Sequence, residues 1–573
     1  MADDLAAALR GAVAQGRPFD LGDIDAATAP AELWVGRSVD AKLVAQVIGE
    51  ASAAGARFEL HGARIIHGTL ILRHSLADVP VRLTSCLIEE GIDCDFGAMA
   101  DLNLKGSKIG PSRQGWGLTG RFVAVSGDLD LSHVLVEGGC RLTGAGIKGS
   151  LVGPGVRVGA HRRPTASDDA TWAIDLTNAT VAGDIDLSDA DLDGGLCLAG
   201  TKVLGQVALM GAAVSAAPAD GPPHGRRAER QISEYCALWG QGCQVAESFV
   251  ACPSGAEGSG RPARFEGYVS LVSAKVPTSI DFSGAQFSGA PSAPAAGRRA
   301  PTRRGERRAA RDSFGVDRQL VALDLFNASA SSISLDQATC PPDLQVDLRN
   351  CAAGRFYPGY PGDKLWHKGQ YGLRGLTYER VSCDPERASP AERAAGRFLR
   401  GWVKRAVDGD IPGPYLALAD AARTAGEPAN ELKAKIMASA AAASWRTRAL
   451  FGWVRYGYRP YLVGIPLALL GLATFAQVRN TSSQANGFVP AVVGTTSYSP
   501  GHCQEVAVRC LDPVAYALEA VIPVDQHQQS TWRPNRGSSR GDVLYWMLVV
   551  DHLFSWLLAG VFVASVGGML KQT

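Results

Sequence analysis

The sequence lacks an excess of charge of either sign, which removes the simplest argument for a nucleic-acid partner. Its 573 residues include 57 lysines and arginines against 56 acids, for a formal net charge of +1. Proteins that bind phosphate backbones usually show a basic excess, so no nucleic acid is expected as a partner. The start, Met1-Ala-Asp-Asp-Leu5, also lacks a basic stretch followed by an apolar core, so we expect no cleavable signal peptide.

Cysteine is sparse, at 12 residues, which is too few for a disulfide-based scaffold. Three cysteines, Cys236, Cys243 and Cys252, share one region, but they lack the C-x-x-C spacing of common zinc sites. We therefore expect free thiols there and no metal. Cys503 and Cys510 lie between two apolar runs, and we expect them to pair if that loop faces an oxidising compartment.

Catalytic motifs are missing as well. The chain has no G-x-S-x-G, no P-loop and no H-E-x-x-H. One G-x-G-x-x-G occurs at Gly144, Gly146 and Gly149, but Ser150-Leu-Val-Gly-Pro-Gly155 follows it and cannot begin the helix that a dinucleotide site needs. We predict no enzyme activity, no catalytic residue and no cofactor.

What the chain does contain is a repeat of eleven residues between Val134 and Ala212. Its unit reads small-x-aliphatic-x-Gly-x-aliphatic-x-aliphatic, as in Ala179-Thr-Val-Ala-Gly-Asp-Ile-Asp-Leu187 and Ala190-Asp-Leu-Asp-Gly-Gly-Leu-Cys-Leu198. A short fixed period is typical of stacked coils, and alternating inward residues indicate short strands. Two units would close a roughly square coil of 22 residues, and about ten coils would form a rod on the order of 50 Å long.

The predicted fold class is therefore mainly β: a right-handed, pentapeptide-repeat-like β-solenoid with an N-terminal helical cap, a helical linker domain and two transmembrane helices. The predicted domains are a cap (1–55), the solenoid (56–352), a connector (353–387), a short-helix domain (388–458), a first transmembrane helix (461–478), an extracytoplasmic loop (479–542) and a second transmembrane helix (543–570). Four loop insertions are expected within the solenoid: 107–121, 153–170, 215–262 and 288–314.

The last insertion is rich in arginine. It either forms a solvated loop or contacts anionic lipid head groups at a cytoplasmic membrane face. The arginines concerned are Arg298, Arg299, Arg303, Arg304, Arg307, Arg308 and Arg311.

The first apolar run, Tyr461 to Val478, has no charge over eighteen residues, near the lower limit for a spanning helix. Four arginines, Arg446, Arg448, Arg455 and Arg459, precede this run, and only Arg479 closely follows it. Because positive residues favour the cytoplasmic side, we predict a two-pass membrane protein. Both the solenoid and the C-terminus would lie in the cytoplasm.

The second run contains Asp551 and His552. A charged side chain at the bilayer centre costs at least about 2.5–3.5 kcal/mol, so such residues usually face protein or water. Either the membrane-embedded part is 553–570 and leaves this pair at the interface, or 543–570 forms a tilted helix with the pair lining a polar seam.

Between the two runs, 513–523 carries Ala515, Leu518 and Ile522 at spacings of three and four. This pattern indicates a short amphipathic helix that lies on or dips into the membrane. Two spans with such a helix between them also occur in simple pore modules.

The rungs resemble those of pentapeptide-repeat proteins, although the eleven-residue period departs from the strict five-residue unit. A triangular coil, as in bactofilins, therefore remains an alternative to a square one. The whole chain more closely resembles a group of actinobacterial proteins usually named membrane-associated oxidoreductases. The resemblance rests on the rungs and on the segments 413–423, 457–461 and 516–525. That name implies redox activity, but the matching motifs are all structural.

Three functions follow as hypotheses. The first is a non-enzymatic, membrane-anchored scaffold or sensor that binds membrane lipids and an unknown protein partner, with homo-oligomers forming through the membrane helices. The second is a pore-forming or membrane-perturbing effector, of a kind used in defence, that the solenoid controls. The third is the oxidoreductase that the family name implies.

Overall fold

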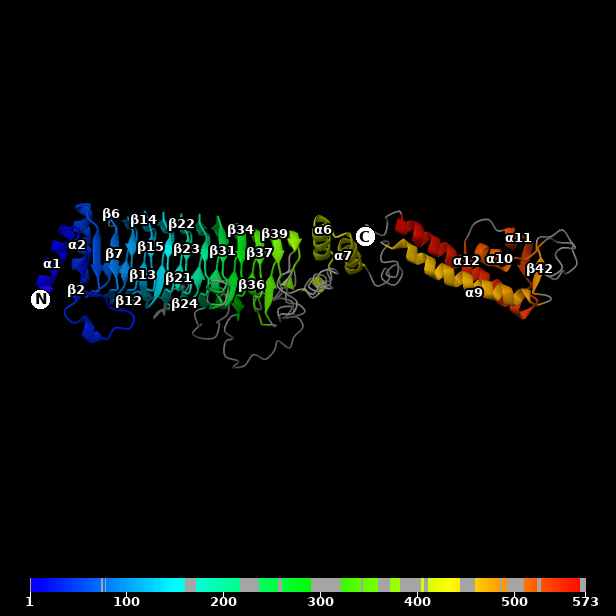
Figure 1. The fold of residues 1–573 in the computed structure, drawn as a ribbon, viewed down its shortest axis with the longest axis horizontal. Coiled ribbons are helices and arrows are strands. Elements are labelled where there is room, and N and C mark those ends of the chain that lie inside the picture. Colours follow the sequence, from blue (N-terminus) through cyan, green and yellow to red (C-terminus); the bar gives the residue numbers. More distant parts are fainter. Residues whose placement is uncertain are drawn as a thin grey trace, which may run out of the picture. The chain divides into compact units, whose positions relative to one another are not determined.

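The computed structural model describes 2–73, 76–77, 79–159, 172–216, 236–255, 260–289, 321–341, 344–358, 371–381, 403–404, 406, 411–443, 459–484, 487–491, 510–522 and 527–566. These residues divide into two compact units, Met1–Glu431 and Leu432–Thr573, each described by itself. The first consists mainly of parallel strands in stacked sheets, and the second is largely helical (Figure 1). Helical content is 29%, so mainly β describes the first unit rather than the whole chain.

The strands of the first unit form three parallel sheets of 20, 10 and 11 strands. The 20-stranded sheet contains β1 (Phe19–Asp20), β3 (Phe58–His61), β6 (Leu76–Ala77), β7 (Val81–Thr84), β10 (Ala98–Met99), β11 (Leu102–Asn103), β14 (Ala124–Val125), β15 (Leu129–Asp130), β18 (Gly146–Ile147), β19 (Leu151–Val152), β22 (Thr180–Val181), β23 (Ile185–Asp186), β26 (Lys202–Val203), β27 (Val207–Ala208), β30 (Gln244–Val245), β31 (Ser248–Val250), β34 (Lys275–Asp281), β37 (Ser329–Ser334), β39 (Ala352–Tyr357) and β41 (Thr377–Val381). The 10-stranded sheet contains β2 (Ser38–Asp40), β4 (Arg64–Ile66), β8 (Leu87–Ile88), β12 (Lys108–Ile109), β16 (Leu135–Val136), β20 (Arg157–Val158), β24 (Asp191–Asp193), β28 (Ala213–Ser215), β32 (Arg264–Glu266) and β35 (Gln286–Phe287). The 11-stranded sheet contains β5 (Leu70–Ile71), β9 (Ile92–Asp93), β13 (Trp116–Thr119), β17 (Gly139–Arg141), β21 (Ile174–Asp175), β25 (Leu196–Cys197), β29 (Cys236–Trp239), β33 (Tyr268–Ser270), β36 (Val321–Asp324), β38 (Gln345–Asp347) and β40 (Tyr371–Gly372).

Successive coils pair in a register of 22 residues, which matches the coil that the eleven-residue repeat predicts. Thr180 pairs with Lys202, Ile185 with Val207, and Asp191 with Ala213. In this regular stretch each coil has four short strands, two in the largest sheet and one in each of the others. From β34 onward, one longer strand replaces the two in the largest sheet, because β34 pairs with both β30 and β31.

The core of the first unit consists of the repeat columns that the sequence marks as inward. Val181, Ile185 and Leu187 are fully buried, as are the small residues Ala190 and Ala212. The cysteines placed in inward columns, Cys86, Cys94, Cys140 and Cys351, are buried too. Burying this apolar surface is the main force that holds one coil on the next.

One corner of the coil combines a glycine with a hydrogen bond from a backbone N–H to a side chain of the neighbouring coil. A Cβ on Gly205 would lie 2.1 Å from Asp184 Oδ1 and 2.8 Å from the carbonyl oxygen of Gly183 in the coil below. Asp184 Oδ1 also accepts the backbone N–H of Gln206 at 2.8 Å, and two coils earlier Asp128 Oδ1 accepts the backbone N–H of Ser150 at 2.7 Å. The G-x-G-x-x-G belongs to the same pattern, since Gly149 sits at this corner against Gly127.

Helices pack at both ends of the stack. At the start, α2 (Ala41–Ala53) packs against β4 and β5, and α1 (Ala2–Ala14) packs against α2, with the 3-10 helix η1 (Ala31–Trp34) between them in sequence. At the other end, α6 (Gly413–Thr424) packs against β41, and α7 (Pro428–Ala442) follows it. These helices cover edges that would otherwise expose unpaired backbone groups.

Three boundaries differ from the sequence prediction. The range 107–121 is not a loop insertion as a whole, because it contains β12 and β13. Only the turn between these two strands extends the coil beyond its regular length. The range 215–262 holds β29, β30 and β31, which place Cys236 and Cys243 in the core instead of in a loop. The stack also continues through β39, β40 and β41 to Val381, beyond the predicted end at 352. The repeat is hard to recognise there because one longer strand, β39 or β41, replaces two short ones.

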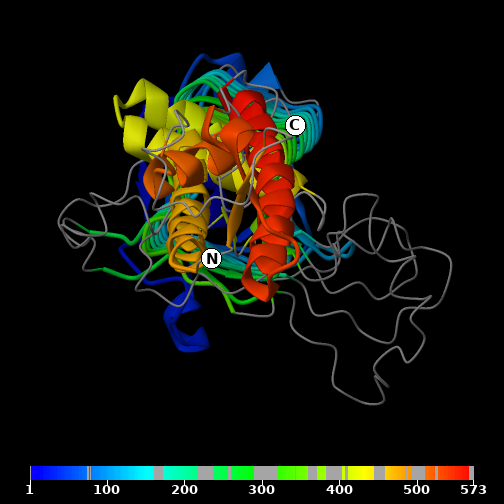
Figure 2. The ribbon, with the colours of Figure 1, turned by 90° about the vertical axis from the view of Figure 1, so that its right-hand side faces the viewer.

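The second unit is built on an antiparallel pair of long helices, which lie side by side in both views (Figures 1 and 2). They are α9 (Gly464–Ser482), extended at its start by the 3-10 helix η6 (Pro460–Val463), and α12 (Ser539–Val566). Val463 packs against Leu558 at one end, and Val478 packs against Leu544 at the other. The two candidate membrane spans are Tyr461–Ser482 and Ser539–Ala564, of 22 and 26 residues.

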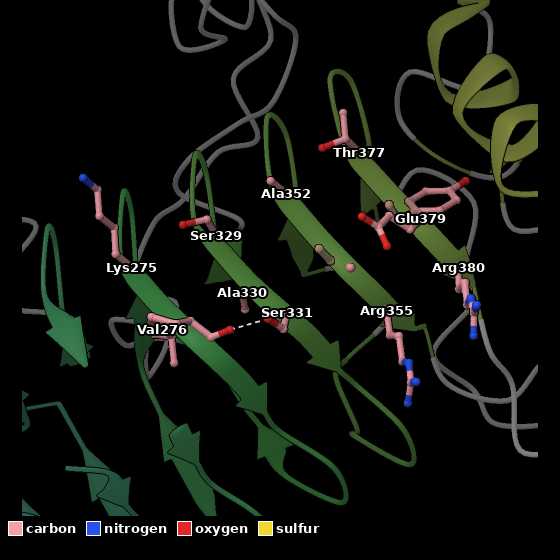
Figure 3. A pocket seen from close by; sticks show the side chains of 14 residues that line it. Lys275, Val276, Ser329, Ala330, Ser331, Ala352, Arg355, Thr377, Glu379 and Arg380 are labelled. Carbon is pink, nitrogen blue, oxygen red and sulfur yellow. Dashed lines mark hydrogen bonds between the residues drawn. The ribbon is translucent and has the colours of Figure 1, made fainter. Parts of the chain in front are cut away.

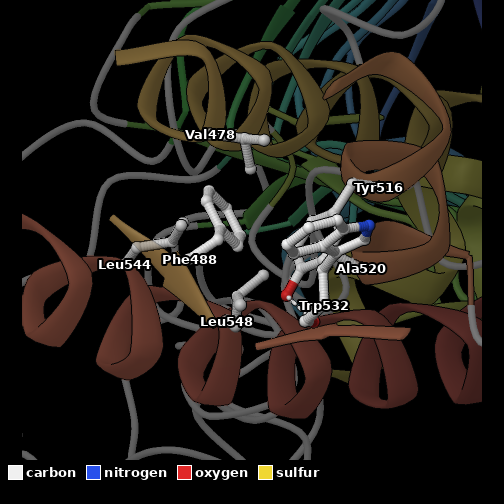
Figure 4. Close-up of a cluster of buried hydrophobic side chains, with 7 residues drawn as sticks. All are labelled: Val478, Phe488, Tyr516, Ala520, Trp532, Leu544 and Leu548. Atoms are coloured by element: carbon white, nitrogen blue, oxygen red, sulfur yellow. Dashed lines mark hydrogen bonds between the residues drawn. The ribbon is translucent and has the colours of Figure 1, made fainter. Parts of the chain in front are cut away.

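The loop between the long helices folds onto one end of the pair. It contains α10 (Pro513–Val521), α11 (His527–Thr531) and a two-stranded antiparallel sheet of β42 (Phe488–Pro490) and β43 (Trp532–Pro534). A buried apolar cluster joins α10, β42 and β43 to both long helices (Figure 4). Its members are Val478, Phe488, Tyr516, Ala520, Trp532, Leu544 and Leu548.

Candidate functional site

The candidate binding site is a hollow on the outer face of β34, β37, β39 and β41, near the C-terminal end of the stack (Figure 3). Its volume is about 1020 Å³. The sequence did not predict this hollow, because it arises where the coil loses its regular four-strand form.

Small side chains form the floor of the hollow. Ala330, Ala352 and Gly354 lie here, and a Cβ on Gly354 would come within 2.8 Å of the Ser331 carbonyl oxygen. The wall at β34 is shaped by a register shift between Val276 and Ser279. Ser331 Oγ donates to the carbonyl oxygen of Pro277 at 2.5 Å and so ties the shifted strand to its neighbour.

The rim of the hollow carries three cationic side chains and one carboxylate. Arg355 and Arg380 are exposed, and they face each other directly in the register of β39 and β41. Lys275 stands on the opposite side, and Glu379 lies beside Arg380 (Figure 3). Adjacent strands are about 4.8 Å apart, and like charges directly opposite each other destabilise a sheet. An anion bound between the two guanidinium groups would remove that repulsion.

The buried thiols have little nucleophilic character. Burial raises the pKa of Cys86, Cys140 and Cys243 to about 12. Because the thiolate is the reactive form, these cysteines act as small apolar core residues. Cys252 is only half-buried, and burial also raises the pKa of its thiol. Among the described residues no three His, Cys, Asp or Glu side chains gather as a metal site would require.

The polar residues of the second apolar run lie inside the helix pair. Asp551 is the thirteenth residue of the 26-residue span, and it is 1% exposed. A hydrogen bond joins its Oδ2 to Thr474 Oγ1 on α9. His552 bonds differently, because its Nδ1 lies 2.9 Å from the carbonyl oxygen of Leu548 on its own helix. The structure thus brings Asp551 to the seam with α9.

Two hydroxyl residues of this seam were not predicted. Thr474 is fully buried, and Ser555, one turn beyond Asp551, is 2% exposed and has no hydrogen-bond partner for its Oγ among the described residues. The signal was available in part: a serine four residues after an aspartate shares its helix face. The partner on α9 could not be found from sequence, because it depends on the register between two helices.

Two predicted sites fall wholly or partly outside the described residues. Cys510 is disulfide-bonded, and Cys503 lies outside the described part of the chain. The whole arginine group, Arg298, Arg299, Arg303, Arg304, Arg307, Arg308 and Arg311, lies in the range 290–320, which is not described.

Comparisons with protein-family models, with curated proteins and with solved structures give no match to this chain.

Proposed function

We propose that this chain is a membrane-anchored scaffold, in which a right-handed, pentapeptide-like β-solenoid binds an acidic, extended protein segment in the hollow. The observation that carries the proposal is the stacked pair Arg355 and Arg380 above a floor of small residues. Guanidinium groups are the preferred partners of carboxylates because they donate in a planar fork.

The dimensions of the hollow suit an extended peptide. The strands β34, β37, β39 and β41 cover about 15 Å at a spacing of about 4.8 Å, the length of four or five extended residues at about 3.3 Å each. Small floor residues let a peptide backbone approach closely. Lys275 at one side and Arg380 at the other would hold carboxylates along the segment.

The helix pair is the proposed anchor in the bacterial inner membrane. At about 1.5 Å per residue, 26 helical residues cover about 39 Å, enough to cross a hydrocarbon core of about 30 Å. The chain enters and leaves the antiparallel pair at the same end, so the N-terminal unit and the C-terminus would share one side, the cytoplasm. The disulfide at Cys510 fits a loop on the oxidising side.

Binding of a labelled oligoglutamate peptide to the full-length protein in nanodiscs of uncharged lipid tests the proposal, with fluorescence anisotropy as the measurement. We expect R355E/R380E to weaken binding ten-fold or more. A ten-fold weakening corresponds to a loss of about 1.4 kcal/mol of binding free energy. The matched control R157E/R264E changes the net charge equally at exposed positions of the 10-stranded sheet. Equal weakening by both double variants, or binding only to nanodiscs of anionic lipid, would refute the proposal.

A second candidate is the pore-forming effector, in which the solenoid controls oligomers of the helix pair. The observation that favours it is a carboxyl group at the middle of a span, together with α10 beside α9. Induced expression separates the two functions. The effector predicts ion leakage that Asp551→Leu abolishes, whereas the scaffold predicts no leakage from either protein.

A further inference from the structure

The contact between α9 and α12 contains a hydroxyl group placed between two oxygen atoms. Thr474 Oγ1 lies 2.9 Å from the carbonyl oxygen of Leu470 and also forms the hydrogen bond with Asp551 Oδ2. A threonine hydroxyl has one hydrogen and can donate it to only one of these oxygens. The carbonyl oxygen of Leu470 has no hydrogen to give, so the second bond needs a proton from the carboxyl group.

An ionised Asp551 does not fit this arrangement. Thr474 would have to share a single hydrogen between two acceptors, and a charge would remain in a site that is 1% exposed. A buried charge is tolerated only when it is paired and hydrogen-bonded. The charged or titratable neighbours to consider are His552 on α12 and Glu519 on α10. His552 Nδ1 is directed at the Leu548 carbonyl, and Glu519 accepts the backbone N–H groups of Gln528 and Gln529.

We propose that Asp551 is a proton-binding site within the helix pair, occupied at neutral pH. The protonated carboxyl donates to Thr474 Oγ1, and Thr474 donates in turn to the carbonyl oxygen of Leu470. In this chain of two hydrogen bonds, each hydrogen has one acceptor. The hydroxyl of Ser555 is a second polar group on the same face of α12. It is buried one turn away and has no partner within the part of the chain that the structure describes. Loss of the proton breaks this chain of hydrogen bonds and leaves a negative charge between the helices. Proton binding is therefore coupled to the packing of α9 against α12.

This inference does not depend on the scaffold proposal, and infrared difference spectroscopy tests it on the full-length protein in nanodiscs. A protonated carboxyl absorbs at a higher frequency than an ionised one, outside the amide bands. At neutral pH, Asp551→Asn should remove one protonated-carboxyl band, because asparagine retains a donor for Thr474 but has no acid. The matched control Asp542→Asn, at an exposed position near the start of the same helix, should remove only an ionised-carboxylate band.

A second variant tests the donor role itself. Thr474→Val removes the acceptor hydroxyl, so the Asp551 band should persist but move to higher frequency, as expected for an acid that loses its hydrogen bond. A merely structural threonine would leave the frequency unchanged, and that result would overturn the assignment. Loss of an ionised band, instead of a protonated one, in Asp551→Asn would overturn the proton site as a whole.

Discussion

At the scale of single residues, glycine has two distinct roles in the repeat. Gly205 is required, because its Cβ position is occupied by Asp184 and by the backbone of the coil below. Gly146, at the second position of its repeat unit and three residues before the corner glycine Gly149, has nothing within 4 Å of its Cβ position. The repeat places Gly205 in the glycine column and Gly146 outside it, and the stacked structure gives the physical reason.

We therefore expect Gly205→Ala to destabilise the protein and Gly146→Ala to have little effect. Forcing a methyl group into a close-packed site typically costs about 1–3 kcal/mol, whereas an alanine in open space loses nothing by contact. Thermal unfolding of both variants, followed by circular dichroism in the β region, checks this. Equal transition temperatures for the two variants would contradict the corner contact.

Asp551 shows what residue-scale reading of a sequence can and cannot provide. A carboxylate within a long apolar run is rare, and this alone identified Asp551 as a candidate in the sequence. Its pairing with Thr474 required the register of α9 against α12.

At the scale of elements, α10 has two apolar faces, one packed inward and one exposed. The sequence predicts a helix over 513–523 with Ala515, Leu518 and Ile522 on its apolar face, and the helix is Pro513–Val521. The opposite face packs inward, through Tyr516 and Ala520. Leu518 and Ile522 are instead about half exposed, together with Val514. Nearly all residues of α10 are apolar, so periodicity alone does not distinguish its two faces.

The position of α10 beside α9 explains what the exposed stripe contacts. Val521 comes within 3.8 Å of the Cβ position of Gly471, which lies near the middle of the span Tyr461–Ser482. Helix α10 therefore lies along the C-terminal half of α9. If α9 spans a membrane as proposed, the stripe of Val514, Leu518 and Ile522 would continue its lipid-facing surface. We infer that acyl chains cover this stripe.

Maleimide labelling in nanodiscs, where both membrane faces are open to water, tests the placement of α10. Leu518→Cys should react slowly with a charged maleimide until detergent is added, because lipid shields it. Ser539→Cys, exposed at the start of α12, should react rapidly in both conditions, and the native cysteines give the background. Rapid labelling of Leu518→Cys in intact nanodiscs would place α10 in water.

At the scale of the whole molecule, the stack of coils could be predicted from the sequence and the hollow could not. The eleven-residue period fixes which residues turn inward, and Val181, Ile185 and Leu187 are buried accordingly. The hollow forms where that period fails, at the long strands β34 to β41 and the register shift after Val276. The regular part of the stack builds a rigid support, and the irregular part supplies the charged surface.

The most direct test of the scaffold is photo-crosslinking from the hollow. A benzophenone amino acid at Ser329, an exposed position of the lining, should crosslink to bound oligoglutamate peptide, and R355E/R380E in the same protein should abolish the adduct. The same group at Arg264, on the 10-stranded sheet, should give none. No adduct from Ser329, or equal adducts from both positions, would contradict the claim that the hollow binds the partner.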